Sequence, residues 1–98
     1  MRYLFVLIVF AISFTVNPMY AGQDEYDDCL LKHLKNAKLD SATQLIIGAC
    51  RENYKEFTIL PEKKIEYNKC LLEYLPGIES SDALIEIQNV CTRKHLKF

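Results

Sequence analysis

Residues 26–34, Tyr-Asp-Asp-Cys-Leu-Leu-Lys-His-Leu, recur 41 positions later as residues 67–75, Tyr-Asn-Lys-Cys-Leu-Leu-Glu-Tyr-Leu. The match continues without a gap at Ala42, Ile46 and Cys50 and at their counterparts 41 residues later. Eight positions are identical in a window of 28 residues, and both cysteines of each copy are among them. A fixed offset of this kind indicates a tandem duplication of one supersecondary unit.

The first 21 residues have the layout of a secretory signal peptide. Arg2 gives a short positive start, residues 3–16 are apolar apart from one serine and one threonine, and Ala21 supplies a small residue at the expected cleavage point. An apolar run of about 14 residues is too short to cross roughly 30 Å of hydrocarbon as a helix. We therefore expect residues 1–21 to be removed on export, which would leave a chain without a membrane segment.

Residues 22–98 are enough for a single domain, and a chain of this size is marginally stable without cross-links. Leaving out Arg2, 11 of the 12 Lys and Arg residues remain against 13 Asp and Glu, which gives a net charge near −2. This balance provides no electrostatic reason to expect a nucleic acid or an anionic membrane as partner. Four cysteines in such an exported chain predict two disulfides and a periplasmic or secreted location.

Helical periodicity runs through both copies and predicts an all-α fold. The expected helices cover about residues 25–35, a segment that starts near residue 41, residues 61–74 and residues 82–94. The inner face of the second helix is expected to consist of Ala42, Leu45, Ile46, Ala49 and Cys50. The two repeats, residues 25–54 and 61–95, are therefore predicted to form two helical hairpins that pack on each other as one compact four-helix domain.

The hairpin turns and the linker carry more specific expectations. Asn36 aligns with Gly77, and both residue types tolerate the left-handed conformation that often ends a helix. Ser41 followed three residues later by Gln44 predicts a capping box at the start of the second helix. The linker, residues 51–60, is too apolar for a free connection, and we expect it to lie against the core.

Four cysteines allow three connectivities, and the duplication favours pairing within each copy. Cys29 lies about six residues before its helix ends and Cys50 about eight residues into the next, roughly 9 and 12 Å from the turn. The two cysteines therefore sit at similar heights in an antiparallel hairpin, as do Cys70 and Cys91 in the second copy. Each bridge would contribute on the order of 3 kcal/mol, so reduction is expected to unfold the domain.

A second use of the cysteines is also open, since His33 follows Cys29 by four residues and His95 follows Cys91 by four. These four side chains could in principle form a tetrahedral zinc site or a redox-responsive centre. However, Tyr54 and Tyr74 stand at the same spacing from the other two cysteines, and tyrosine is not a zinc ligand. The pattern therefore favours flat rings that pack beside disulfides, with no cofactor.

Nothing in the sequence resembles a catalytic set, and both histidines lack a recognisable carboxylate or nucleophile partner. The chain is richer in aromatic and aliphatic residues than a small core accommodates, and such residues are typical of protein-binding patches. A duplicated hairpin would present two similar faces related by approximate twofold symmetry. We therefore expect a non-enzymatic accessory or inhibitor-type protein that binds another protein through Tyr54, Phe57, Ile59, Tyr74 and Phe98.

The repeated unit Tyr-x2-Cys-Leu-Leu-x2-Leu, followed by Ala-x3-Ile-x3-Cys behind a signal peptide, resembles a family of small exported bacterial four-cysteine proteins. The resemblance covers Tyr26 to His95 and includes Arg51, whose counterpart in the second copy is Thr92. That family carries no established activity. The resemblance therefore implies an exported, disulfide-bonded protein and does not imply a reaction.

The mass of the oxidised protein distinguishes the two uses of the cysteines. We expect the intact chain to be lighter than the reduced chain by four hydrogen atoms, two for each of two bridges, and to retain no metal. Peptide mapping should place both bridges within the repeats. Bridges that run only between the first and second halves would contradict the duplication of a cross-linked hairpin.

Overall fold

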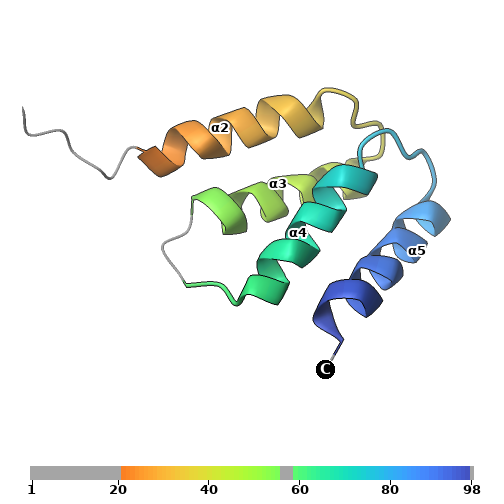
Figure 1. The fold of residues 1–98 in the computed structure, drawn as a ribbon. Helices are drawn as coiled ribbons and strands as arrows, with labels where there is room; N and C mark the ends of the chain where they lie inside the picture. Colours follow the sequence, from red (N-terminus) through yellow and green to blue (C-terminus); the bar gives the residue numbers. More distant parts are fainter. Residues whose placement is uncertain (1–20, 56–58, 98) are drawn as a thin grey trace, which may run out of the picture.

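The computed structural model describes residues 21–55 and 59–97, and helices are the only regular secondary structure in this part of the chain. The elements are α2 (Ala21–Leu34), α3 (Asp40–Tyr54), α4 (Glu62–Tyr74), α5 (Ser81–Cys91) and η3 (Thr92–Leu96), a π-helical end that continues α5 (Figure 1). The predicted all-α class is therefore confirmed. Among the helices described, none is long and apolar enough to cross a bilayer. The predicted signal peptide lies outside the described residues except for Ala21.

Two helix boundaries differ from the prediction. The first helix begins at Ala21 and not near residue 25, and its first turn lies close to the end of α3. A Cβ atom added to Gly22 would lie only 2.8 Å from the carbonyl oxygen of Tyr54, so glycine permits this close approach. The fourth helix was expected to continue to Lys94, but α-helical bonding ends at Cys91 and gives way to the π-helical turn.

The helix starts show which capping residues are used. Ser80 precedes α5 with an extended backbone, and its hydroxyl accepts a hydrogen bond of 3.2 Å from the Ala83 amide. The predicted capping box at Ser41 is wrong, because α3 already begins at Asp40 and Leu39 is the cap residue. A cap must have a non-helical backbone, and Ser41 lies within the first helical turn.

The hairpin turns follow one design in both copies. The Ala37 amide donates to the Leu34 carbonyl at 3.0 Å, and the Ile78 amide donates to the Leu75 carbonyl at 3.3 Å. Only the second turn uses a left-handed residue, Gly77 with φ 89°. No other residue in the described segments has positive φ, so the prediction for Asn36 is wrong: the first turn closes without it.

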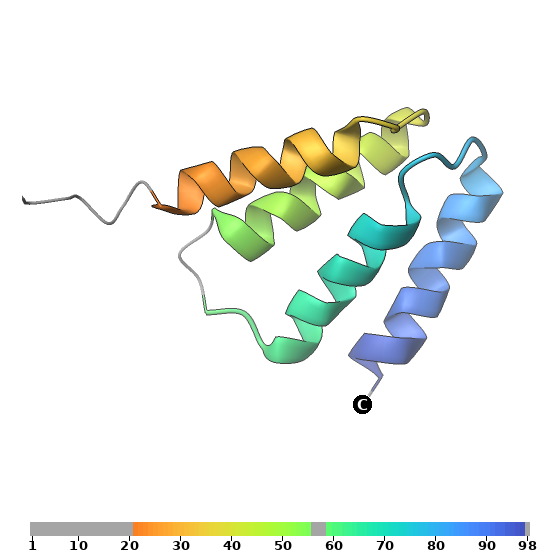
Figure 2. The ribbon, with the colours of Figure 1, turned by 45° about the horizontal axis from the view of Figure 1, so that its top comes forward.

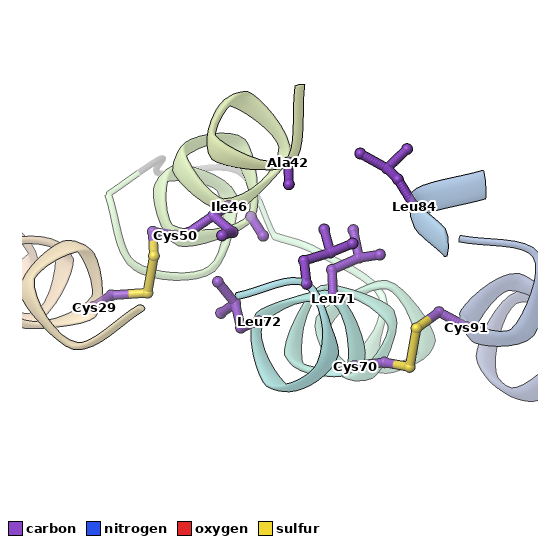
Figure 3. Packing of buried hydrophobic residues seen from close by; sticks show 11 residues of the cluster. Cys29, Ala42, Ile46, Cys50, Cys70, Leu71, Leu72, Leu84 and Cys91 are labelled. Atoms are coloured by element: carbon purple, nitrogen blue, oxygen red, sulfur yellow. A yellow bond between two sulfur atoms is a disulfide. The ribbon is translucent and has the colours of Figure 1, made fainter. Parts of the chain in front are cut away.

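Each hairpin is cross-linked as predicted. Figures 1 and 2 show the two hairpins, α2 with α3 and α4 with α5. Cys29 is bonded to Cys50 and Cys70 to Cys91 (Figure 3), and the Cα atoms of both pairs are 5.8 Å apart. The pairing within copies is therefore confirmed. Equal Cα separations show that the two helices of each hairpin approach each other equally closely at the bridge.

The hairpins contact each other through non-equivalent helices. Among the described residues, α3 packs on α4, whereas α2 packs mainly on α3, and α5 and η3 pack on α4. Figure 3 shows α3 and α4 between the two bridges, with α2 and α5 on opposite outer sides. The expected twofold relation is wrong, because it would require α2 to pack on α5 as α4 packs on α3. The second helix of one copy instead receives the first helix of the next.

Burial follows this arrangement. On α3, Ala42 and Ile46 are fully buried and Ala49 is 2 % exposed, which confirms most of the predicted inner face, although Leu45 is only partly buried. The remaining aliphatic core comes from the second copy: Leu71, Leu72, Leu75 and Leu84. The two copies of the repeated unit therefore contribute different positions to the contact between the hairpins.

One polar contact joins α3 and α4 within this largely apolar interface. Asn68 of α4 is 1 % exposed, and its amide donates a hydrogen bond of 2.8 Å to the side-chain oxygen of Asn53 on α3. The Asn53 amide donates in turn to the carbonyl of Ile65 at 3.3 Å. The two hairpins are therefore joined by a satisfied amide pair as well as by burial.

Removing this pair from one side should destabilise the domain. We expect Asn53→Ala to lower the free energy of unfolding by about 1–3 kcal/mol, because the buried Asn68 amide loses its acceptor. Lys38→Ala is the matched control, since it removes an exposed ion pair of 3.1 Å with Glu79 that also joins the hairpins; such pairs contribute about 0–1 kcal/mol. Urea unfolding of the oxidised proteins measures both. A larger loss for Lys38→Ala would contradict the assignment.

Candidate protein-binding surface

The predicted rings lie beside the disulfides in both hairpins. His33 and Tyr54 line a depression of about 350 Å³ next to Cys29, and Tyr74 and His95 line one of about 180 Å³ next to Cys70. Every residue of the first depression has its counterpart, 41 positions later, in the second. The histidine and the tyrosine exchange places between the copies. A flat ring at these positions is therefore the shared feature, and its chemical identity varies.

The four residues of the metal alternative are not brought together. Cys29 and Cys91 are each bonded to another cysteine, in bridges that lie on opposite sides of the α3–α4 pair (Figure 3). His33 and His95 line separate depressions. In residues 21–55 and 59–97, no group of three or more His, Cys, Asp or Glu side chains is arranged to hold a metal ion.

His33 has a perturbed electrostatic environment. Burial lowers the pKa of His33 below its usual range, and the neighbouring positive charge of Lys32 lowers it further. A hydrogen bond to the backbone of Leu72 acts in the opposite direction and is the weaker influence. The contact with Leu72 places His33 at the seam between the two hairpins.

The five residues of the predicted binding surface have different surroundings. Tyr54 is partly buried and packs against the core, so its ring contributes to the packing of the domain. Ile59 is 99 % exposed and Tyr74 is 55 % exposed. The exposure of Ile59 contradicts the expectation that the whole linker lies against the core. Phe57 and Phe98 lie outside the described residues.

A shallow apolar groove joins Tyr74 to the outer face of the second hairpin. We call it the outer groove; it has a volume of about 230 Å³ and is lined by Cys70, Tyr74, Glu86, Ile87, Val90, Cys91 and Lys94. Val90 is 40 % exposed. The lining is mainly apolar and carries one acidic and one basic side chain. It offers a site for an apolar group with charges beside it.

Sequence reasoning missed most of the exposed apolar side chains. Leu31 is 75 % exposed on α2, and Ile85 is 50 % exposed on α5. The structure reveals Leu31 when the copies are compared, because its counterpart Leu72 has the same side chain and is only 4 % exposed. A leucine that is conserved between the repeats but buried in only one of them marks a face that the fold leaves uncovered.

Comparison with known proteins identifies one family. A family model described as "Four-cysteine protein VF_A0006-like" matches residues 6–95, which is most of the chain. The match includes all four cysteines and both repeats. No curated protein and no solved structure gives a significant match to the chain.

The position of His33 predicts how stability depends on pH. Because the pKa of His33 is lowered in the folded protein, the unfolded chain binds its proton more readily. This contribution to stability is complete above pH 6.5 and is lost as the pH falls from 6.5 through the folded-state pKa. In His33→Gln, the denaturant concentration at the midpoint of unfolding should change less between pH 7.5 and about 5 than it does in the wild type. In the matched His95→Gln variant, the fall in the unfolding midpoint at low pH should remain as in the wild type. A fall that disappears in His95→Gln but remains in His33→Gln would contradict the assignment to His33.

Proposed function

The chain belongs to the Four-cysteine protein VF_A0006-like family, and we propose that it acts as an exported, non-enzymatic protein-binding module of the accessory or inhibitor type. Disulfides persist in oxidising compartments, and the two bridges together with the signal-peptide pattern of residues 1–21 support a periplasmic or secreted location. The bridges serve to keep a small domain folded there.

The outer groove is the observation that carries the proposed activity. Its volume of about 230 Å³ is below the roughly 300–1,000 Å³ of typical small-molecule sites, but it is large enough for an apolar side chain of a partner. Tyr74 and Val90 are partly exposed at this groove, and aromatic residues are enriched at protein interfaces. Glu86 and Lys94 supply charges that can orient a partner.

A retention experiment with matched variants tests this function. The oxidised protein is immobilised and exposed to an exported-protein fraction, beside Val90→Lys and Ile85→Lys. Val90→Lys places a charge in the groove, whereas Ile85→Lys replaces an exposed apolar side chain of the same helix that does not line the groove. We expect at least one protein that the wild type and Ile85→Lys retain in equal amount and Val90→Lys loses. Identical retention by all three would overturn the proposal.

A further inference from the structure

The contact between the hairpins provides a template for a contact between chains. It is made by the second helix of copy one and the first helix of copy two, which are non-equivalent elements of a repeated unit. A contact of this head-to-tail type leaves one unused face at each end, here on α2 and on α5. The exposed face of α2 corresponds to the buried face of α4, and that of α5 with η3 corresponds to the buried face of α3.

The buried half of the template shows what each open face would receive. In the first hairpin, Ile46 and Cys50 are fully buried, and Figure 3 shows the Leu72 side chain of α4 directed toward them. In the second hairpin, their counterparts Ile87 and Cys91 line the outer groove. The counterpart of Leu72 is Leu31, which is 75 % exposed on α2. The chain thus carries both an uncovered leucine and an uncovered groove of the kind that this leucine occupies internally.

We propose that the outer groove binds a second copy of this chain, which inserts Leu31 of its α2 beside Ile87 and Val90. The inference rests on the proposed protein-binding function of the same groove and names its partner. The α2 face of the second copy would lie on α5 and η3 as α4 lies on α3. Each chain then has one donor face, around Leu31, and one acceptor face, the outer groove.

The charges on the two faces match when the template is transferred. In the transfer, each residue of the internal contact is replaced by its counterpart in the other repeat, 41 positions away. Asn53 and Asn68, joined by a 2.8 Å hydrogen bond, are then replaced by Lys94 of one copy and Asp27 of the other, which have opposite charges. Asp27 lies on an exposed part of α2, where it accepts a hydrogen bond from Gln23. Lys94 is also exposed, at the edge of the outer groove.

Two ion pairs between the hairpins are compatible with the same transfer. The Lys38–Glu79 ion pair is replaced by Glu79 of one copy and Lys38 of the other, which again have opposite charges. The contact of Lys64 with Glu52, at 4.0 Å, becomes Gln23 against Arg93, a neutral side chain against a charge. None of these three contacts becomes a like-charge pair. Electrostatics therefore favours a second copy in this register.

Sedimentation velocity of the oxidised protein tests the proposal. The chain is expressed from residue 1, and its amino terminus is determined by mass spectrometry. We expect concentration-dependent association, weakened at least tenfold by Leu31→Lys or by Val90→Lys and unchanged by Ile85→Lys, whose side chain is exposed and does not line the groove. Both sites are exposed, so neither variant should alter the helical content measured by circular dichroism.

Mixing the two variants separates this contact from other kinds of association. The Leu31→Lys chain retains its groove and the Val90→Lys chain retains its leucine, so an equal mixture should form a one-to-one dimer and no larger species. Asp27→Lys and Lys94→Asp should each weaken association, and the double variant should restore it. In a twofold-symmetric dimer each wild-type pair would make two Leu31–groove contacts and the mixed pair would keep only one, so the mixture would associate more weakly than the wild type.

Two results would overturn self-association: a wild type that stays monomeric up to about 1 mM, or variants that fail to pair when the wild type associates. If the wild type is monomeric but the retention experiment still finds a protein whose binding depends on Val90, the protein-binding function stands and the partner is a different chain. If neither is observed, both the partner and the proposed function are wrong.

Discussion

The structure depends on a cross-link between two antiparallel helices at equal height from their turn. Each cysteine is placed so that its partner on the neighbouring helix is 5.8 Å away at the Cα atoms. A bridge that closes a loop of this length removes conformational freedom from the unfolded chain. For a domain of this size, that constraint supplements the limited burial available from four short helices. The core positions, the turns and both ring-lined depressions are arranged around it.

Much of this architecture could be predicted from the sequence because the chain contains its own alignment. The 41-residue offset identified the hairpins, their cysteine pairing and the rings beside each bridge. Ser41 and Asn36 show where local signals fail. A capping pattern was present at Ser41, but the cap residue is Leu39, two positions earlier, and the first turn closes without a left-handed residue. Competing caps and turns differ by small free energies, which tertiary packing decides.

The candidate site was predicted less completely, since exposure is a property of how the repeats pack. Tyr74 was identified correctly as exposed, but Tyr54 packs on the core. Leu31 was missed because a periodic pattern assigns it to a helix and cannot say that its face lacks a neighbour. The packing of α3 on α4, rather than of equivalent helices on each other, determines which copy of each residue is covered. The sequence of a single repeat does not determine which helices of the two repeats pack together.

The amide pair between the hairpins limits how they can slide past each other. Moving α4 along α3 by one turn, about 5.4 Å, would keep leucines against alanines and isoleucines but would separate Asn68 from Asn53. Aliphatic side chains tolerate such a shift far better than a buried amide does. The Asn53–Asn68 hydrogen bond therefore selects one register of α4 along α3. Hydrophobic burial alone would allow several registers with similar free energies.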